Sequence, residues 1–121
     1  MNSDEPLRCI QEEQRDFYLK LTTENASSMT YFKRRWDENR GDEYAGWGCS
    51  DYYFEVIPDG TVIRQMEIYD SGVVLQYHPD HLTDTFGFLT DQSIDLSEFA
   101  PFSISRQEFE AAWASHQPLN R

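Results

Sequence analysis

The sequence lacks lysine and arginine over a long internal stretch. The 41 residues between Arg64 and Arg106 contain neither lysine nor arginine, yet they contain seven carboxylates. These carboxylates are Glu67, Asp70, Asp80, Asp84, Asp91, Asp95 and Glu98. Because this stretch cannot neutralise its own charge, it projects a negative field that attracts partners of the opposite sign. The formal net charge of −12 disfavours nucleic acids and anionic membranes and favours a basic partner.

Cysteine is also scarce, since the chain has only Cys9 and Cys49 and no Cys-x-x-Cys pair. Two thiols do not make a disulfide framework in a chain of 121 residues, which is long enough to bury a core without one. The first four residues are polar and acidic, and no apolar run approaches the length of a membrane span. We therefore expect a protein of the reducing cytoplasm.

Helical periodicity is present near the N-terminus. Leu7, Ile10, Phe17 and Leu21 share one face, which predicts an amphipathic helix over residues 6–22. A small polar stretch follows, so we divide the chain into an N-terminal helical extension with its linker, 1–28, and a single α+β domain, 29–121. The apolar face of the helix offers a surface for a second copy, which leaves a homodimer through this helix open.

Strand patterns begin at residue 30. Alternation and β-prone residues predict strands over 31–36, 51–57, 62–69 and 73–77. Asp59-Gly60 marks a tight hairpin turn between the second and third, and short connections predict an antiparallel meander. The weakly periodic segment 78–101 is long for a loop, and its apolar residues are expected to pin it to the core.

A C-terminal helix is predicted by the capping-box pair Ser105 and Glu108, with Phe109, Ala112 and Trp113 on one face. The expected fold is therefore α+β. An about four-stranded, mainly antiparallel sheet is packed by this helix on one face, and an additional amphipathic helix precedes it. An antiparallel sheet permits the other face to remain solvated.

Several motifs follow one another in a recognisable order. They are Trp36-Asp37-Glu38, Gly46-Trp47-Gly48, Tyr53-Phe54-Glu55-Val56, the run from Arg64 to Tyr69, Asp95-Leu96 with Glu98-Phe99, and Ser105 with Glu108, Phe109 and Trp113. Over about residues 29–115 the chain resembles an uncharacterised family of small acidic bacterial single-domain proteins. Some lone acidic bacterial domains of this kind are immunity proteins of toxin systems. The resemblance implies a fold and a class of partner, and it supplies no functional residues.

Two clusters have residues that suit other chemistries. His78, His81 and Asp84 have ligand types that a zinc ion accepts, but a solvated acidic turn produces the same letters. Lys33, Arg34 and Arg35 lie between Tyr31 and Trp36, as in some nucleic-acid-binding strands. Given the acidic balance, pairing of these bases with carboxylates such as Glu55 and Glu67 is favoured.

Catalytic signatures are missing from the sequence. There is no Gly-x-Ser-x-Gly, no phosphate-binding glycine loop and no cysteine close to a histidine in the sequence. Carboxylate pairs are too numerous among 22 acids to indicate acid–base catalysis. We therefore expect a binding protein rather than an enzyme, with no cofactor and no resident metal.

The leading hypothesis is a small acidic module that neutralises or regulates a basic protein, in its most concrete form a toxin-immunity-type inhibitor of a nuclease-like toxin. Trp47 is predicted either to be an exposed anchor or to fold back over the sheet. One alternative is a nucleic-acid-mimicking inhibitor, such as a phage or plasmid factor. Another is a metal-dependent enzyme or metal-binding protein that uses His78, His81 and Asp84. The expected partner-binding residues are Asp37, Glu38, Asp42, Glu43, Trp47, Asp80, Asp84 and Asp91.

Overall fold

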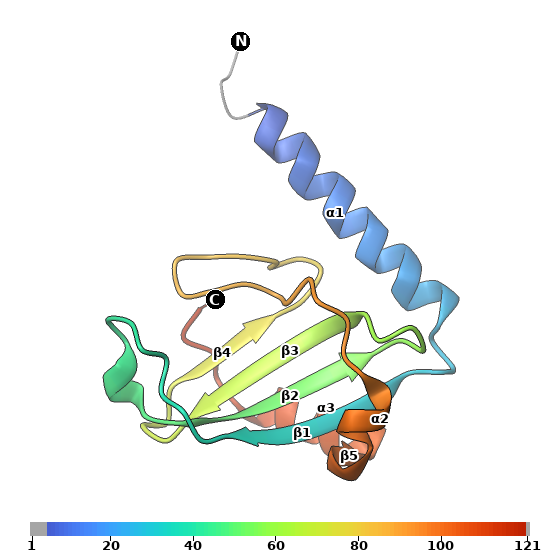
Figure 1. The fold of residues 1–121 in the computed structure, drawn as a ribbon. Coiled ribbons are helices and arrows are strands. Elements are labelled where there is room, and N and C mark those ends of the chain that lie inside the picture. Colours follow the sequence, from blue (N-terminus) through green and yellow to red (C-terminus); the bar gives the residue numbers. More distant parts are fainter. Residues whose placement is uncertain (1–4, 121) are drawn as a thin grey trace.

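A computed structural model describes residues 5–120, with side chains from residue 11 onward. The chain forms a five-stranded antiparallel sheet of order β4-β3-β2-β1-β5, and α3 lies behind this sheet in Figure 1. The predicted α+β class and antiparallel sheet are confirmed. In chain order the elements are α1 (Glu5–Glu24), β1 (Thr30–Trp36), the 3-10 turn η1 (Ala45–Trp47), β2 (Ser50–Val56), β3 (Val62–Tyr69), β4 (Val74–Tyr77), α2 (Leu96–Phe99), the 3-10 turn η2 (Ala100–Phe102), β5 (Ser103–Ile104) and α3 (Arg106–Ser115).

The sheet contains one strand more than the predicted four. The additional strand, β5, consists of two residues and pairs with β1 through Tyr31 opposite Ile104. Two residues are too few to show alternation, so no sequence pattern marks this strand. Ser105 caps α3 as predicted, because its side chain accepts a hydrogen bond from the Glu108 backbone N–H at 3.0 Å.

A small aromatic core fills the space between α3 and the sheet face that it packs against. Phe109 is fully buried and packs against Tyr31, 5.1 Å away between ring centroids, and against Tyr53. Arg64 lies over the rings of Phe109 and Trp113, at 4.8 and 5.0 Å, and its charge is held by carboxylates of the sheet and of α3. The predicted helical face is therefore the face that packs on the sheet.

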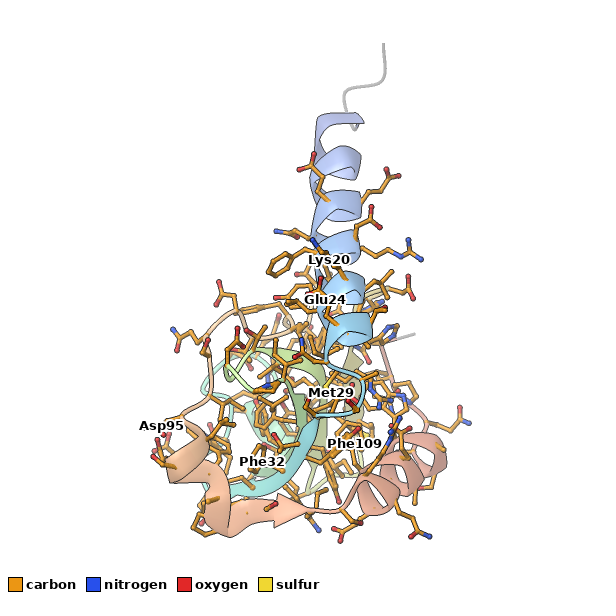
Figure 2. The ribbon with its side chains drawn as sticks, turned by 90° about the vertical axis from the view of Figure 1, so that its right-hand side faces the viewer. Lys20, Glu24, Met29, Phe32, Asp95 and Phe109 are labelled. Atoms are coloured by element: carbon orange, nitrogen blue, oxygen red, sulfur yellow. The ribbon has the colours of Figure 1, made fainter. Side chains whose placement is uncertain are left out.

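The opposite face of the sheet, which an antiparallel fold allows to stay solvated, is covered in large part. Figure 2 places Phe32 and Phe109 on opposite sides of β1, with Asp95 on the Phe32 side. On the Phe32 side, the segment 78–102 crosses the sheet and contributes Leu89 to the buried core. The sequence does not predict where this segment packs, because its apolar residues follow neither a helical nor a strand period. Those that pack against this core are Leu82, Phe86, Ile94, Leu96 and Phe99.

The crossing segment is fixed to the β2–β3 turn at Gly60. The Ile94 N–H donates to the Gly60 carbonyl at 2.8 Å, and Gly60 has a φ of +94°. A Cβ atom at Gly60 would collide with the carbonyl oxygen of Ile94. Glycine is therefore required here both for the turn and for the close approach of the two backbones.

Helix α1 extends away from the sheet (Figures 1 and 2). Its described contacts with the domain are few: Tyr18 packs against the core edge, and Arg15 pairs with Asp80. Phe17 remains 56% exposed. Leu7 and Ile10 belong to the predicted amphipathic face, and their side chains lie outside the described residues, as does that of Cys9. Among the described helices, none is sufficiently long and apolar to cross a membrane.

Deletion of residues 1–28 is expected to leave a folded domain. The described contacts that would be lost are one exposed ion pair, worth up to about 1 kcal/mol, and the packing of Tyr18. Thermal unfolding followed by circular dichroism should remain one cooperative transition with a midpoint only a few degrees lower. Loss of the transition would instead make α1 part of the domain core. Light scattering of both proteins would also show whether a homodimer depends on this helix.

Candidate functional site

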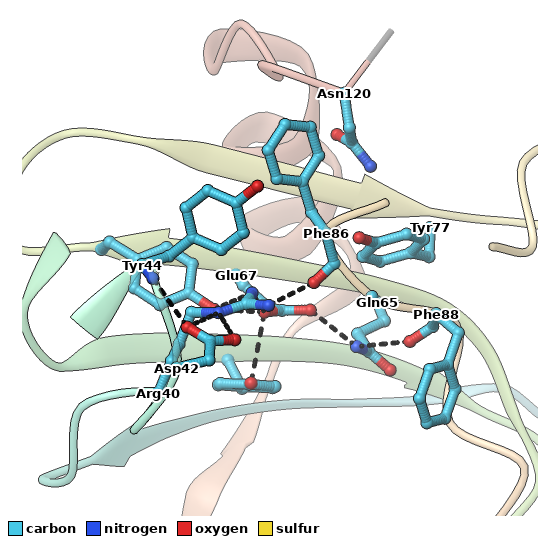
Figure 3. A network of polar contacts seen from close by, with 12 residues as sticks. Arg40, Asp42, Tyr44, Gln65, Glu67, Tyr77, Phe86, Phe88 and Asn120 are labelled. Atoms are coloured by element: carbon cyan, nitrogen blue, oxygen red, sulfur yellow. Dashed lines mark hydrogen bonds and ion pairs between the residues drawn. The ribbon is translucent and has the colours of Figure 1, made fainter. Parts of the chain in front are cut away.

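A cavity of about 750 Å³ opens on the sheet face opposite α3. This volume is within the usual range for ligand pockets. The floor is formed by β2 and β3, one wall by the segment 38–42, and the other by the segment 86–99. Figure 3 shows the polar network that joins these three parts. None of the floor residues belongs to the predicted partner-binding set.

Strand alternation brings the floor side chains to one face. On β2 these residues include Tyr52, and on β3 they include Gln65, Glu67 and Tyr69. The antiparallel register places Tyr52 directly opposite Glu67. Side chains at i and i+2 of a strand lie on the same face, so Gln65, Glu67 and Tyr69 form one row beneath the opening.

Glu67 is the centre of the network, although its residue is only 4% exposed. The hydroxyls of Tyr69 and Tyr52 donate to Glu67 Oε1 at 2.5 and 3.2 Å, and Gln65 Nε2 donates to Oε2 at 2.9 Å. Arg40 Nη1 lies 4.0 Å from Oε1. These partners compensate the desolvation of the buried carboxylate. Burial and the Glu67 charge raise the pKa of Tyr69 to about 12, so this hydroxyl remains a donor at neutral pH.

Gln65 connects the floor to the wall formed by 86–90. Its Nε2 also donates to the Phe88 carbonyl at 3.3 Å, and its Oε1 accepts from the Thr90 N–H at 3.0 Å. A buried amide that satisfies two backbone groups of a loop fixes the position of that loop. The cavity therefore has a defined wall even though this wall contains no long helix or strand.

Each end of the cavity has a guanidinium held by aromatic rings and carboxylates. At one end, Arg40 lies over Tyr44 and Trp47, at 5.3 and 5.5 Å from their centroids, and pairs with Asp42 at 3.1 Å. Its Nη2 also donates to the Phe86 carbonyl.

At the other end, Arg34 lies over Phe99 and Phe102, at 4.8 and 4.7 Å, and pairs with Glu98 at 3.2 Å. We call these two arrangements the Arg40 cage and the Arg34 cage. In both, cation–π contacts and an ion pair act on the same planar group.

The cavity as a whole is acidic. Five carboxylates line it against two guanidinium groups, and both guanidinium groups already have carboxylate partners. Two large aromatic side chains at its edge remain exposed: Trp36 by 50% and Phe88 by 59%. The carboxylates are Glu38, Asp42, Glu67, Asp95 and Glu98.

The first part of the predicted partner-binding set lies near this cavity. Glu38 and Asp42 line it, Glu43 is exposed, and Asp37 pairs with Arg35 at 3.3 Å. Trp47 is partly buried, and its ring stacks on Tyr44 at 4.6 Å and contacts Tyr69 edge-on at 5.2 Å. Of the two placements considered for Trp47, the structure has the one in which it folds back over the sheet.

Of the remaining predicted residues, Asp80 and Asp84 lie away from this cavity. Asp80 pairs with Arg15 of α1 and lines a smaller cleft between that helix and residues 79–83. Asp91 is exposed. Asp84 is turned inward, with its side chain only 17% exposed. The eight residues therefore do not form one continuous surface.

Asp84 is occupied by hydrogen bonds within the protein. It accepts from Tyr77 Oη at 2.8 Å and Asn120 Nδ2 at 2.9 Å, and it contacts His81 Nε2 at 2.7 Å. The rings of His78 and His81 are 6.2 Å apart. Over residues 5–120 the side chains described bring together no group of three His, Cys, Asp or Glu residues that could hold a metal ion.

The basic run on β1 has partners that differ from those predicted. Arg35 pairs with Asp70 at 2.9 Å, and Lys33 lies over the Tyr53 ring at 5.5 Å. Glu55 instead pairs with Arg64 at 2.8 Å, and the guanidinium nearest Glu67 is that of Arg40. The two carboxylates named as examples, Glu55 and Glu67, are therefore not the partners of these bases. Most of the carboxylates that hold these bases come from loops and α2, which sequence spacing does not place, although Asp51 of the neighbouring strand β2 also lies 4.0 Å from Arg35.

Comparisons with protein-family models, with curated proteins and with solved structures find no match. The family resemblance therefore stays a prediction, and functional inference rests on the geometry and charge of this chain.

Replacement of Asp84 by asparagine is expected to destabilise the fold. Burial alone would raise the pKa of Asp84, but hydrogen bonds from His81, Asn120 and the Phe86 N–H lower it to about 2. Asp84→Asn should therefore reduce the free energy of unfolding by about 2 kcal/mol at pH 7. Because the folded-state pKa is depressed, this contribution is complete above pH ~4 and disappears as the pH falls towards 2.

Urea unfolding of both proteins across pH 2–7 measures this difference, with the exposed Asp91→Asn as the matched control. A constant difference down to pH 2 would show that the Asp84 charge is not what stabilises this region.

Proposed function

We propose that this chain is a small acidic binding module that occludes a basic protein, most concretely as a toxin-immunity-type inhibitor. The observation that carries the proposal is the acidic, aromatic-edged cavity on the sheet face opposite α3. A partner seated over this cavity would meet fixed carboxylates and two exposed aromatic rings together. Aromatic anchors within a charged rim are the residues that contribute most to many protein interfaces.

The internal ion pairs support the proposal because they neutralise the arginines of the sheet region. Arg34, Arg35, Arg40 and Arg64 are each within 4.0 Å of at least one carboxylate. Several acids near the cavity have no ion pair among the described side chains. They are Glu38, Glu43, Asp91 and Asp95. The uncompensated charge is thus negative on the face that carries the cavity.

The partner class follows from this field. A nuclease-type toxin must present basic groups to grip phosphates, and those same groups are attracted by an acidic inhibitor. Charge complementarity of this kind accelerates encounter and disfavours wrong partners. Inhibition then needs no chemistry, because a module of this size seated on the phosphate-binding surface excludes the substrate.

Charge reversal on the cavity face is expected to weaken binding strongly. The triple variant Glu38→Lys, Glu43→Lys and Asp91→Lys should weaken affinity for the basic partner at least a hundredfold and flatten its salt dependence. The control triple Glu12→Lys, Glu13→Lys and Glu108→Lys has the same net charge but changes exposed residues of α1 and α3.

Both triples should be measured by calorimetry at several salt concentrations with the partner purified from the native cells. The proposal predicts a small effect for the control. Equal losses in the two triples would mean that net charge alone matters, and no loss in either would contradict the proposal.

A further inference from the structure

We infer that the cavity opposite α3 receives an arginine side chain of the partner. The inference rests on the proposed function and names the group that the same site recognises. It is carried by three properties of the cavity: how it holds the chain's own arginines, which aromatic rings it leaves exposed, and the sign of its remaining charge.

The chain's own arginines show which group the cavity wall accommodates. In the Arg34 cage, two phenylalanine rings lie within 4.8 Å of the guanidinium carbon and Glu98 accepts a hydrogen bond from Nη1. In the Arg40 cage, Tyr44 and Trp47 contribute the rings and Asp42 the carboxylate. The cavity thus repeats the same recognition chemistry at both ends, and the open volume between them is lined by the same residue types.

Two aromatic rings of this volume have much of their surface uncovered. Trp36 is 50% exposed, and its described aromatic neighbour is Tyr52, 6.4 Å away between centroids. Phe88 is 59% exposed on the opposite wall. Leaving large aromatic rings in water is unfavourable, and a guanidinium stacked on such a ring recovers both apolar contact and a cation–π attraction.

The charge of the cavity selects a cation. Glu38 and Asp95 line it without an ion pair among the described side chains, and Glu67 lies at its floor. The ion pairs of Arg34 with Glu98 and of Arg40 with Asp42 leave three of the five carboxylates without a matching cation, so an anionic ligand would be repelled. Arginine is favoured over lysine because its planar, weakly hydrated guanidinium can stack on a ring while donating to a carboxylate.

The probe is the tripeptide acetyl-Gly-Arg-Gly-amide, titrated into the isotopically labelled full-length protein. Nuclear magnetic resonance would follow the indole N–H of Trp36 and the backbone amides of Gln65, Glu67 and Thr90. Saturable shifts confined to these groups are expected. Replacing arginine by citrulline, which has nearly the same shape but no charge, should weaken binding at least tenfold, and lysine should bind more weakly than arginine.

Matched variants locate the binding site. The double variant Trp36→Ala and Phe88→Ala should weaken tripeptide binding at least tenfold, measured on the floor amides. Phe17→Ala removes an equally exposed aromatic ring from α1 and should leave binding unchanged. Both aromatic side chains are exposed, so an unchanged circular dichroism spectrum and unfolding midpoint are expected for each variant.

Equal binding of citrulline and arginine peptides, or shifts outside the cavity, would overturn the inference. The two proposals can fail separately. Suppose that the triple lysine variant weakens binding of the basic partner, but that the tripeptide does not bind and the Trp36/Phe88 double variant binds the partner normally. The cavity assignment then fails and the proposed function stands. If the tripeptide binds in the cavity but the charge triple leaves partner affinity unchanged, the cavity assignment stands and the proposed function fails.

Discussion

The burial of the Glu67 carboxylate is the constraint on which the sheet face opposite α3 depends. A carboxylate that is 4% exposed needs hydrogen-bond donors, and here they come from Tyr52, Tyr69 and Gln65. Gln65 then fixes the segment 88–90, while Arg40 connects Glu67 to the segment 40–42 and to Phe86. One buried charge therefore sets the floor and both walls. Because these groups satisfy one another, they hold a polar cavity where an antiparallel sheet would otherwise bury apolar side chains.

A second regularity is the way in which the fold places its arginines. On the α3 side, Arg64 lies over two aromatic rings and pairs with Glu55 and Glu110. On the cavity side, Arg34 and Arg40 are held in the same manner. Each arrangement neutralises a cation inside the domain and packs its flat group against apolar surface. As a consequence, these arginines stabilise the fold through internal contacts, and the exposed surface carries an excess of carboxylates.

The sequence predicts those elements whose signals are local. The bounds of β3, the Asp59-Gly60 turn and the Ser105 cap follow from alternation, turn chemistry and capping, each of which needs only a few neighbouring residues. The cavity is different. Gln65 and Glu67 are polar residues two positions apart on β3, a pattern that is typical of a strand face in contact with solvent. Only the path of the segment 78–102, which has no regular period, converts that face into a buried floor.

The same reason explains the mixed outcome for the candidate residues. Glu38 and Asp42 were identified from local acidity and do line the cavity, but Trp36, Arg40 and Phe88 were missed. Their importance depends on long-range placement. The Tyr52–Glu67 pairing does not follow from the hairpin turn alone, because an irregularity between Glu55 and Val56 shifts the register of β2 and β3 by one residue.

The most direct measurement is capture of the protein's partner from its native cells at low salt, followed by hydrogen–deuterium exchange on the purified complex. The account predicts one basic protein, bound stoichiometrically and released as salt rises, with protection of the segments 36–42 and 86–99 around the cavity. A partner that stays bound at high salt would contradict this account. So would protection from hydrogen–deuterium exchange that is centred on α3 instead of these segments.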